Sequence, residues 1–179
     1  MQINIILFLL IGLFSNNMIS QVEIIPGKGL VFNNDSIIVH KCSPKDLCKI
    51  LNIKDTVEIN HISISEYDSK GNFVPDFSIK SIFFAEFEFQ FSGYKDDEIR
   101  LRNIYINMSK PYHTFIISNT KLADTSIDIV KKYRKSIRKE MDSGETTSLT
   151  ESSNNGITFL LDTSHRKIIK ICVHKIEKE

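Results

Sequence analysis

Two carboxylates stand two residues apart in one apolar, strand-like segment of this chain. Glu86 and Glu88 alternate with phenylalanine and alanine over residues 82–91. In a single strand both side chains would point to the same face, about 7 Å apart. Glycosidases use a pair of carboxyl groups at such a separation. The same alternation is what a half-exposed strand shows, and we prefer that structural interpretation.

Cysteine and histidine supply the second candidate chemistry. His40 lies two residues before Cys42, and His174 lies two residues after Cys172, so each pair would share a strand face and could form a Cys–His dyad. Neither pair carries a nucleophile elbow. The third cysteine, Cys48, gives an odd number that cannot all pair within the chain. A Cys42–Cys48 disulfide and three free thiols are alternatives, and we favour free thiols, since unpaired cysteine is often buried.

Other motifs give little support to catalysis. The sequence has no glycine-rich phosphate loop, no Gly-x-Ser-x-Gly, no His-Glu-x-x-His, no calcium loop and no metal-ligand spacing. We therefore predict no catalytic, cofactor or metal site. The acidic run 96–98 is interpreted as a solvated turn, and the sequon at 107–109 as a chance triplet. The net charge of +1 provides no general attraction to nucleic acid or anionic lipid.

The first twenty residues carry no Lys, Arg, Asp or Glu. Their apolar block, Ile5–Phe14, has the length of a secretory signal core and is too short for a comfortable membrane span. Small and polar residues precede Gln21, so we predict a signal peptide over 1–20 and an exported, periplasmic or secreted domain over 21–179. An uncleaved anchor and a buried N-terminal element are the alternatives. No later stretch is apolar enough to span a membrane.

Apolar runs bounded by turn residues predict strands, and a hydroxyl residue followed three residues later by Asp predicts each helix start. The strands are expected at 22–25, 30–32, 36–41, 56–65, 82–91, 99–108, 112–118, 157–162 and 167–176. One helix is expected over 44–52, capped by Ser43, and a second opens at Thr125. The polar stretch 142–155 is expected to be a mobile loop.

The faces of two strands follow from their patterns. Over 82–91 the expected inner face consists of Phe83, Ala85, Phe87, Phe89 and Phe91, and the outer face of Glu86, Glu88 and Gln90. Residues 99–108 are expected to pair with this strand in an irregular register. In the last strand we expect Ile169, Ile171 and Val173 to point inward.

These elements predict an α+β fold in which an antiparallel sheet carries two helices packed on one face. The two helix starts also match each other, and a predicted hairpin follows each helix. A tandem strand–helix–hairpin repeat, with halves near 22–118 and 119–179, is therefore weighed against a single domain over 21–179.

A repeating unit of capped helix, apolar strand, Asp-containing turn and Ile-rich strand can be followed through Thr125–Tyr133, Ile157–Asp162 and Arg166–Val173, and more loosely through Ser43–Leu51. It resembles small bacterial envelope modules of the outer-membrane-assembly lipoprotein (SmpA/OmlA) and beta-lactamase-inhibitor-protein type. The chain lacks the lipid-bearing Cys and the Gly-Pro pair that often ends such a helix. The resemblance implies a non-enzymatic binding or scaffold role.

We therefore expect an exported binding or inhibitor-type module. Its partner would be another envelope or secreted protein, with no cofactor, metal or nucleic acid. The candidate contact surface is the outer sheet face with Glu86, Glu88, Gln90, Arg100 and Arg102. Two alternatives stay open: a small exported hydrolase that uses His with acidic or Cys residues, and a structural cell-surface protein.

Overall fold

The structure is a computed structural model, and it describes residues 21–53, 59–67, 70, 72–94, 98–122, 127–133, 139–141, 148–153, 155–162 and 167–176. The predicted signal peptide lies outside these residues. Within them, no helix is both long enough and apolar enough to cross a membrane.

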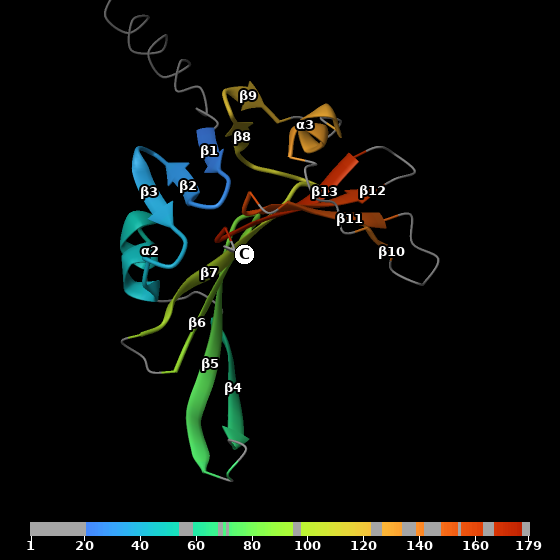
Figure 1. The fold of residues 1–179 in the computed structure, drawn as a ribbon. Helices are drawn as coiled ribbons and strands as arrows, with labels where there is room; N and C mark the ends of the chain where they lie inside the picture. Colours follow the sequence, from blue (N-terminus) through green and yellow to red (C-terminus); the bar gives the residue numbers. More distant parts are fainter. Residues whose placement is uncertain are drawn as a thin grey trace, which may run out of the picture.

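The described chain forms two β-sheets (Figure 1). The smaller sheet has the order β3-β2-β1-β8-β9, in which β1 and β8 run parallel and the other neighbours run antiparallel. Its strands are β1 (Gln21–Ile25), β2 (Gly29–Phe32), β3 (Asp35–Ile38), β8 (Thr114–Ile117) and β9 (Thr120–Lys121). The strands expected at 22–25, 30–32 and within 112–118 are thereby confirmed, and the strand expected at 36–41 lies at Asp35–Ile38.

The larger sheet is antiparallel and has the order β10-β11-β12-β13-β7-β6-β5-β4. Its strands are β4 (Ile59–Tyr67), β5 (Phe73–Phe84), β6 (Phe87–Gly93), β7 (Arg100–Asn107), β10 (Lys139–Met141), β11 (Ser148–Ser153), β12 (Ile157–Asp162) and β13 (Lys167–His174). In Figure 1, β4 and β5 form a long hairpin that projects beyond the smaller sheet. The predicted pairing of β6 with β7 is confirmed, with a register irregularity between Gln90 and Phe91.

The core lies between the two sheets. One face of β6 contributes Phe87, Phe89 and Phe91, which are at most 2% exposed. The ring of Phe32 on β2 packs edge-on against Phe87 at a centroid distance of 6.4 Å, so the smaller sheet covers this inner face of the larger one. Burying apolar area of this kind is the main term that stabilises such a fold.

The two described helices are short. α2 (Pro44–Ile50) begins at the predicted cap, where Ser43 and Asp46 form a reciprocal capping box. Within its own span α2 buries Leu47, while α3 (Ile127–Lys132) buries Ile129 and Val130. α2 contacts β3, and Figure 1 shows α3 well away from it, near β8 and β9.

The predicted α+β class, with two helices packed on one face of a sheet, is therefore wrong: the fold is mostly β. Each helix is about two turns long or less, too short to cover a sheet, and the smaller sheet does so instead. A strand–helix–hairpin unit is also wrong, because four described strands of the larger sheet follow each helix, β4–β7 after α2 and β10–β13 after α3. The last strands of these two sets, β7 and β13, pair directly, so residues 22–118 and 119–179 share one sheet.

Three local predictions are corrected. The expected strand 82–91 is two strands, because the chain turns at Ala85 and Glu86, with φ of +51° at Ala85. The expected loop 142–155 contains β11, which pairs with β12 along its whole length. In β13 the inward residue is Ile168 and not Ile169, because the register shifts between Leu160 and Leu161 of β12.

Candidate functional site

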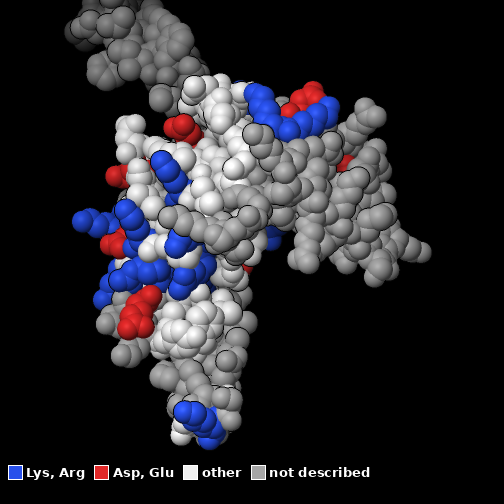
Figure 2. Space-filling model, viewed as in Figure 1, with Lys and Arg blue, Asp and Glu red and all other residues white. Residues whose placement is uncertain are grey.

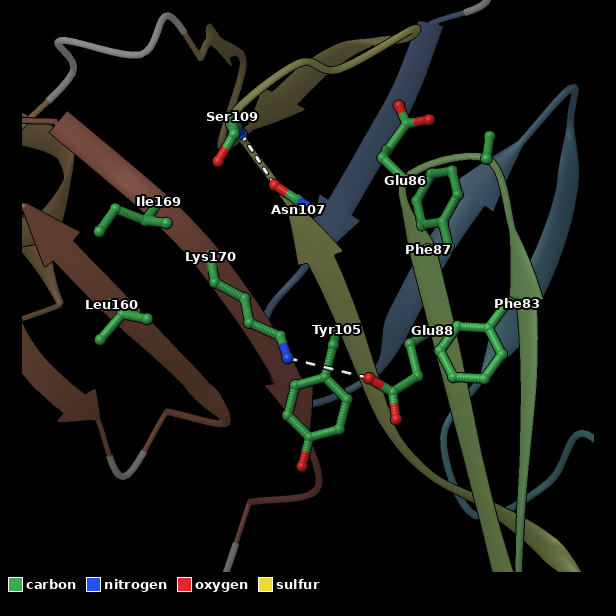
Figure 3. A pocket seen from close by; sticks show the side chains of 11 residues that line it. Phe83, Glu86, Phe87, Glu88, Tyr105, Asn107, Ser109, Leu160, Ile169 and Lys170 are labelled. Carbon is green, nitrogen blue, oxygen red and sulfur yellow. Dashed lines mark hydrogen bonds and ion pairs between the residues drawn. The ribbon is translucent and has the colours of Figure 1, made fainter. Parts of the chain in front are cut away.

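The outer face of the larger sheet, opposite the core, carries partly exposed side chains. A hollow of about 300 Å³ lies on this face and extends across strands β5, β6, β7, β13 and β12 (Figure 3). We call it the sheet-face hollow. It is lined by Phe83, Ala85, Glu86, Phe87, Glu88, Tyr105, Asn107, Ser109, Leu160, Ile169 and Lys170.

A charged and aromatic cluster forms the centre of the sheet-face hollow. Strand register places Glu88 of β6 opposite Tyr105 of β7, and Tyr105 opposite Cys172 of β13. The Nζ atom of Lys170 lies 3.8 Å from Glu88 Oε2 and 4.4 Å from the centre of the Tyr105 ring (Figure 3). The Ser81 hydroxyl donates to Glu88 Oε1 at 3.2 Å. These contacts hold the Lys170 ammonium between a carboxylate and an aromatic face.

The Tyr105 phenol remains protonated at neutral pH. Burial raises its pKa above the ordinary value, and the neighbouring Cys172 and Glu88 raise it further. A neutral phenol both donates and accepts hydrogen bonds, which suits a polar contact at the edge of an apolar surface.

Apolar side chains surround this polar centre. Phe83 is 40% exposed although it lies on a strand of the sheet. Leu160 and Ile169 line the opposite side of the hollow and are partly buried. Ile169 reaches this face because of the register shift between β12 and β13. The hollow therefore combines exposed apolar surface with a few fixed polar groups.

The predicted pair of carboxylates is not assembled as a strand-face pair. Glu86 lies in the turn between β5 and β6, and its side chain is only 2% exposed. Its Oε1 atom accepts from the backbone N–H of His113 at 3.0 Å and from the ring Nδ1 of His113 at 2.8 Å. Figure 3 shows the carboxylate of Glu86 pointing away from that of Glu88. Glu86 therefore holds the segment before β8 in place, and Glu88 alone belongs to the centre of the hollow.

The predicted Cys–His dyads are not assembled as nucleophile and base. His40 and Cys42 follow the end of β3, and His40 Nδ1 lies 2.7 Å from Arg102 Nη1 and not against the thiol. His174 does share a face with Cys172, but its Nε2 contacts the Thr158 hydroxyl at 3.1 Å.

The two thiols in these predicted dyads are also poor nucleophiles. Burial raises the pKa of Cys42 to about 11, with Asp46 and Cys48 adding to the effect. Burial likewise raises the pKa of Cys172 to about 11, although Lys170 and a hydrogen bond with Tyr105 oppose it. Both are thiols and not thiolates at neutral pH. All three cysteines are free.

The predicted contact surface is divided between two places. Glu88 and Gln90 lie on the outer face, where Gln90 Oε1 accepts from Asn103 at 2.8 Å. Arg102 donates to Ser92 on the same face at 3.2 Å, whereas Arg100 lies beside the start of α2. Glu86 does not belong to this surface, for the reason given above.

The remaining candidates add no chemistry to the hollow. Asn107 of the sequon accepts from the backbone N–H of Ser109 at 2.9 Å. Of the acidic run, Glu98 is exposed, and residues 96 and 97 lie outside the described residues, as do His165 and the side chain of His61. Within the described part of the chain, no group of three or more His, Cys, Asp or Glu side chains could hold a metal ion.

The sequence did not point to Tyr105 or Lys170, and the prediction that Phe83 and Ala85 belong to the inner face is wrong, because both are exposed and line the hollow. Tyr105 and Lys170 meet only because β7 and β13 pair, although the strands lie far apart in the chain. A signal for Phe83 was present: the doublet Phe83-Phe84 breaks strict alternation and marks the point where the inner face changes phase.

Comparison of the chain with protein-family models, with curated proteins and with solved structures finds no match.

Proposed function

We propose that this protein is an exported, non-catalytic binding module that docks another envelope or secreted protein on the outer face of its larger sheet. The observation that carries the proposal is the sheet-face hollow, where Phe83, Leu160 and Ile169 surround the Glu88–Lys170–Tyr105 cluster. Partly exposed aromatic groups next to fixed charges are typical of the central residues of protein interfaces.

The geometry favours binding over the hydrolase alternative. The two thiols of the predicted dyads are held protonated by burial, and the two carboxylates serve separate purposes. The groups at the centre of the hollow instead satisfy one another, through the Ser81–Glu88 and Lys170–Glu88 contacts. Such pre-organised polar groups contribute to specificity in an interface, because they lose little freedom on binding.

The experiment is affinity capture from an envelope extract with the mature protein starting at Gln21. We expect one stoichiometric protein partner with the unmodified sequence. Truncation of central aromatic residues in an interface weakens binding by about 10-fold or more. A protein with both Phe83→Ala and Tyr105→Ala should therefore lose the partner.

The matched control is Tyr67→Ala. Tyr67 is 70% exposed and ends β4, the edge strand of the same sheet, which is separated from β7 by β5 and β6. This variant should retain the partner. Equal retention by the control and the Phe83/Tyr105 variant would refute the outer face as the docking site, and repeated recovery of no partner would refute the binding role. Export is tested separately, because the mature protein should begin at or close to Gln21 and not at Met1.

A further inference from the structure

Basic side chains gather around two adjoining hollows on a different surface, beside β2, β3 and the start of α2. The hollows have volumes of about 650 Å³ and about 660 Å³, and Lys41 lines both. Their linings contain one acidic residue, Asp46, and six Lys or Arg residues, which we call the basic patch: Lys28, Lys41, Lys45, Lys80, Arg100 and Lys175. In Figure 2, Lys and Arg side chains gather on the face that shows α2 and β3.

Asp46 is ionised and offsets only one of these charges. Its Oδ2 atom accepts from the backbone N–H of Ser43 at 3.0 Å and from the Ser43 hydroxyl at 2.6 Å, so the carboxylate is committed to the helix cap. The side chain and backbone of Ser43 lower the pKa of Asp46, and the Arg100 charge adds to them. The net charge of the whole chain is only +1, whereas Lys28, Lys41, Lys45 and Lys175 alone outnumber Asp46 among the lining residues.

The walls of the hollows limit the kind of anion that fits. Ile25 and Ile38 line the first hollow together with the backbone of Gly27 and Gly29, so apolar groups can enter beside the cations. None of the residues that line either hollow is Phe, Tyr or Trp, the side chains on which nucleic-acid bases stack. The surface is hollowed, whereas contact with a flat bilayer favours protruding apolar anchors.

We propose that the basic patch binds an acidic, extended polypeptide segment of a partner, with carboxylates against the lysines and apolar side chains in the hollows. Lysines distributed around two adjoining hollows match charges spaced along a chain better than a single compact anion, for which a convergent bidentate Arg site would be expected. The basic patch shares no lining residue with the sheet-face hollow. This site is therefore additional to the proposed docking face and does not depend on it.

The test is fluorescence anisotropy with the mature protein and a labelled peptide of alternating Glu and Leu. We expect binding that weakens at least about 10-fold when Gln replaces every Glu, and that falls steeply as salt is raised, because rim charges act largely through screened electrostatics. Lys41→Glu should weaken binding about 10-fold as well, since Lys41 lines both hollows and is exposed.

Lys121→Glu is the matched control. Lys121 is exposed on β9, at the opposite edge of the smaller sheet from β3, and its substitution changes the net charge equally. This variant should bind the peptide within about two-fold of the unmodified protein. Circular dichroism of both variants establishes that they fold.

Three results would overturn the proposal. The first is equal peptide affinity for the Lys41→Glu and Lys121→Glu proteins. The second is tighter binding of a thymidine oligonucleotide than of the acidic peptide. The third is stronger adsorption to phosphatidylglycerol vesicles than to the peptide, which would assign the patch to a membrane surface.

Discussion

Removal of the Glu86 carboxylate tests whether this residue is structural. Glu86→Ala leaves two donors of His113 unpaired, the backbone N–H and the ring Nδ1–H, each now within 3.0 Å of Glu86 Oε1. The site is buried and aromatic, because the Glu86 side chain is 2% exposed and the His113 ring packs against Phe32 and Phe87 at 5.2 and 5.5 Å. Leaving two buried donors without a partner costs about 2–6 kcal/mol. For a domain of this size that corresponds to a fall in Tm of about 4–24 °C.

The assay is urea unfolding followed by circular dichroism, with Glu88→Ala as the control. Glu88 is 27% exposed and its contact with Lys170 is long, at 3.8 Å, so its removal should cost about 1 kcal/mol or less. Glu86→Gln keeps Oε1 as an acceptor but loses the charge, and should cost about 1–3 kcal/mol. The Glu86→Ala and His113→Ala effects should also be strongly non-additive. Equal losses of stability in Glu86→Ala and Glu88→Ala would refute the structural role of Glu86. Additive effects of Glu86→Ala and His113→Ala would also refute it.

Three further outcomes are expected. Because burial raises the pKa of Cys172 from 9.0 to about 11, iodoacetamide should alkylate it about 100-fold more slowly in the folded than in the urea-unfolded protein; mass spectrometry that finds equal rates contradicts this. Gly29→Ala should cost about 2–4 kcal/mol in urea unfolding, because its Cβ would lie 1.9 Å from the Ile37 carbonyl oxygen at a φ of +142°; Ser36→Ala, also on this hairpin, should cost much less. Burial, Arg102 and Lys175 lower the pKa of His40, so the unfolded chain binds the proton more readily and stability should fall as pH drops through 6.5; His40→Gln should flatten that decline, and an unchanged slope argues against it.

Local patterns predicted the parts of the fold that depend on neighbouring residues. The Ser43–Asp46 spacing gave the start of α2, because a capping box is formed within four residues. Alternation gave β6 and its pairing with β7, since a hairpin is closed by adjacent segments. The Asp142–Asn155 stretch failed for the opposite reason. It contains Leu149 as its one apolar residue, yet β11 forms within it because its backbone pairs with the ladder of β12.

Pairings between distant segments were out of reach, and the candidate site depends on one of them. β1 pairs in parallel with β8, and β7 pairs with β13. Neither pairing can be predicted from the residue pattern of one strand alone. The sequence could assign Glu88 to a sheet face, but it could not predict that Tyr105 and Lys170 lie beside it. The prediction that the helices cover the sheet failed for a related reason. An apolar stripe shows that a helix is partly buried, but it does not show which element covers the sheet.

The turn at Ala85 and Glu86 determines where the carboxylates of Glu86 and Glu88 lie. It sets Phe84 directly opposite Phe87, so the inner face passes from even positions in β5 to odd positions in β6. In an uninterrupted strand, Glu86 would point to the same face as Glu88. Because of the turn, the Glu86 side chain no longer follows the strand alternation, and it contacts His113 instead. The turn lacks the Gly, Asn or Asp that usually permits positive φ, and Ala85 adopts φ of +51°.

That conformation costs an alanine about 1–2 kcal/mol, a penalty that glycine does not have. Glycine loses about 0.5–1 kcal/mol through greater freedom in the unfolded chain. Ala85→Gly should therefore raise the free energy of unfolding by up to about 1.5 kcal/mol, as measured in urea. Deletion of Ala85 should instead prevent folding, because a one-residue shift would turn the buried phenylalanines of β6 toward solvent. A destabilised Ala85→Gly protein, or a stable deletion variant, would show that this turn does not set the register of β6.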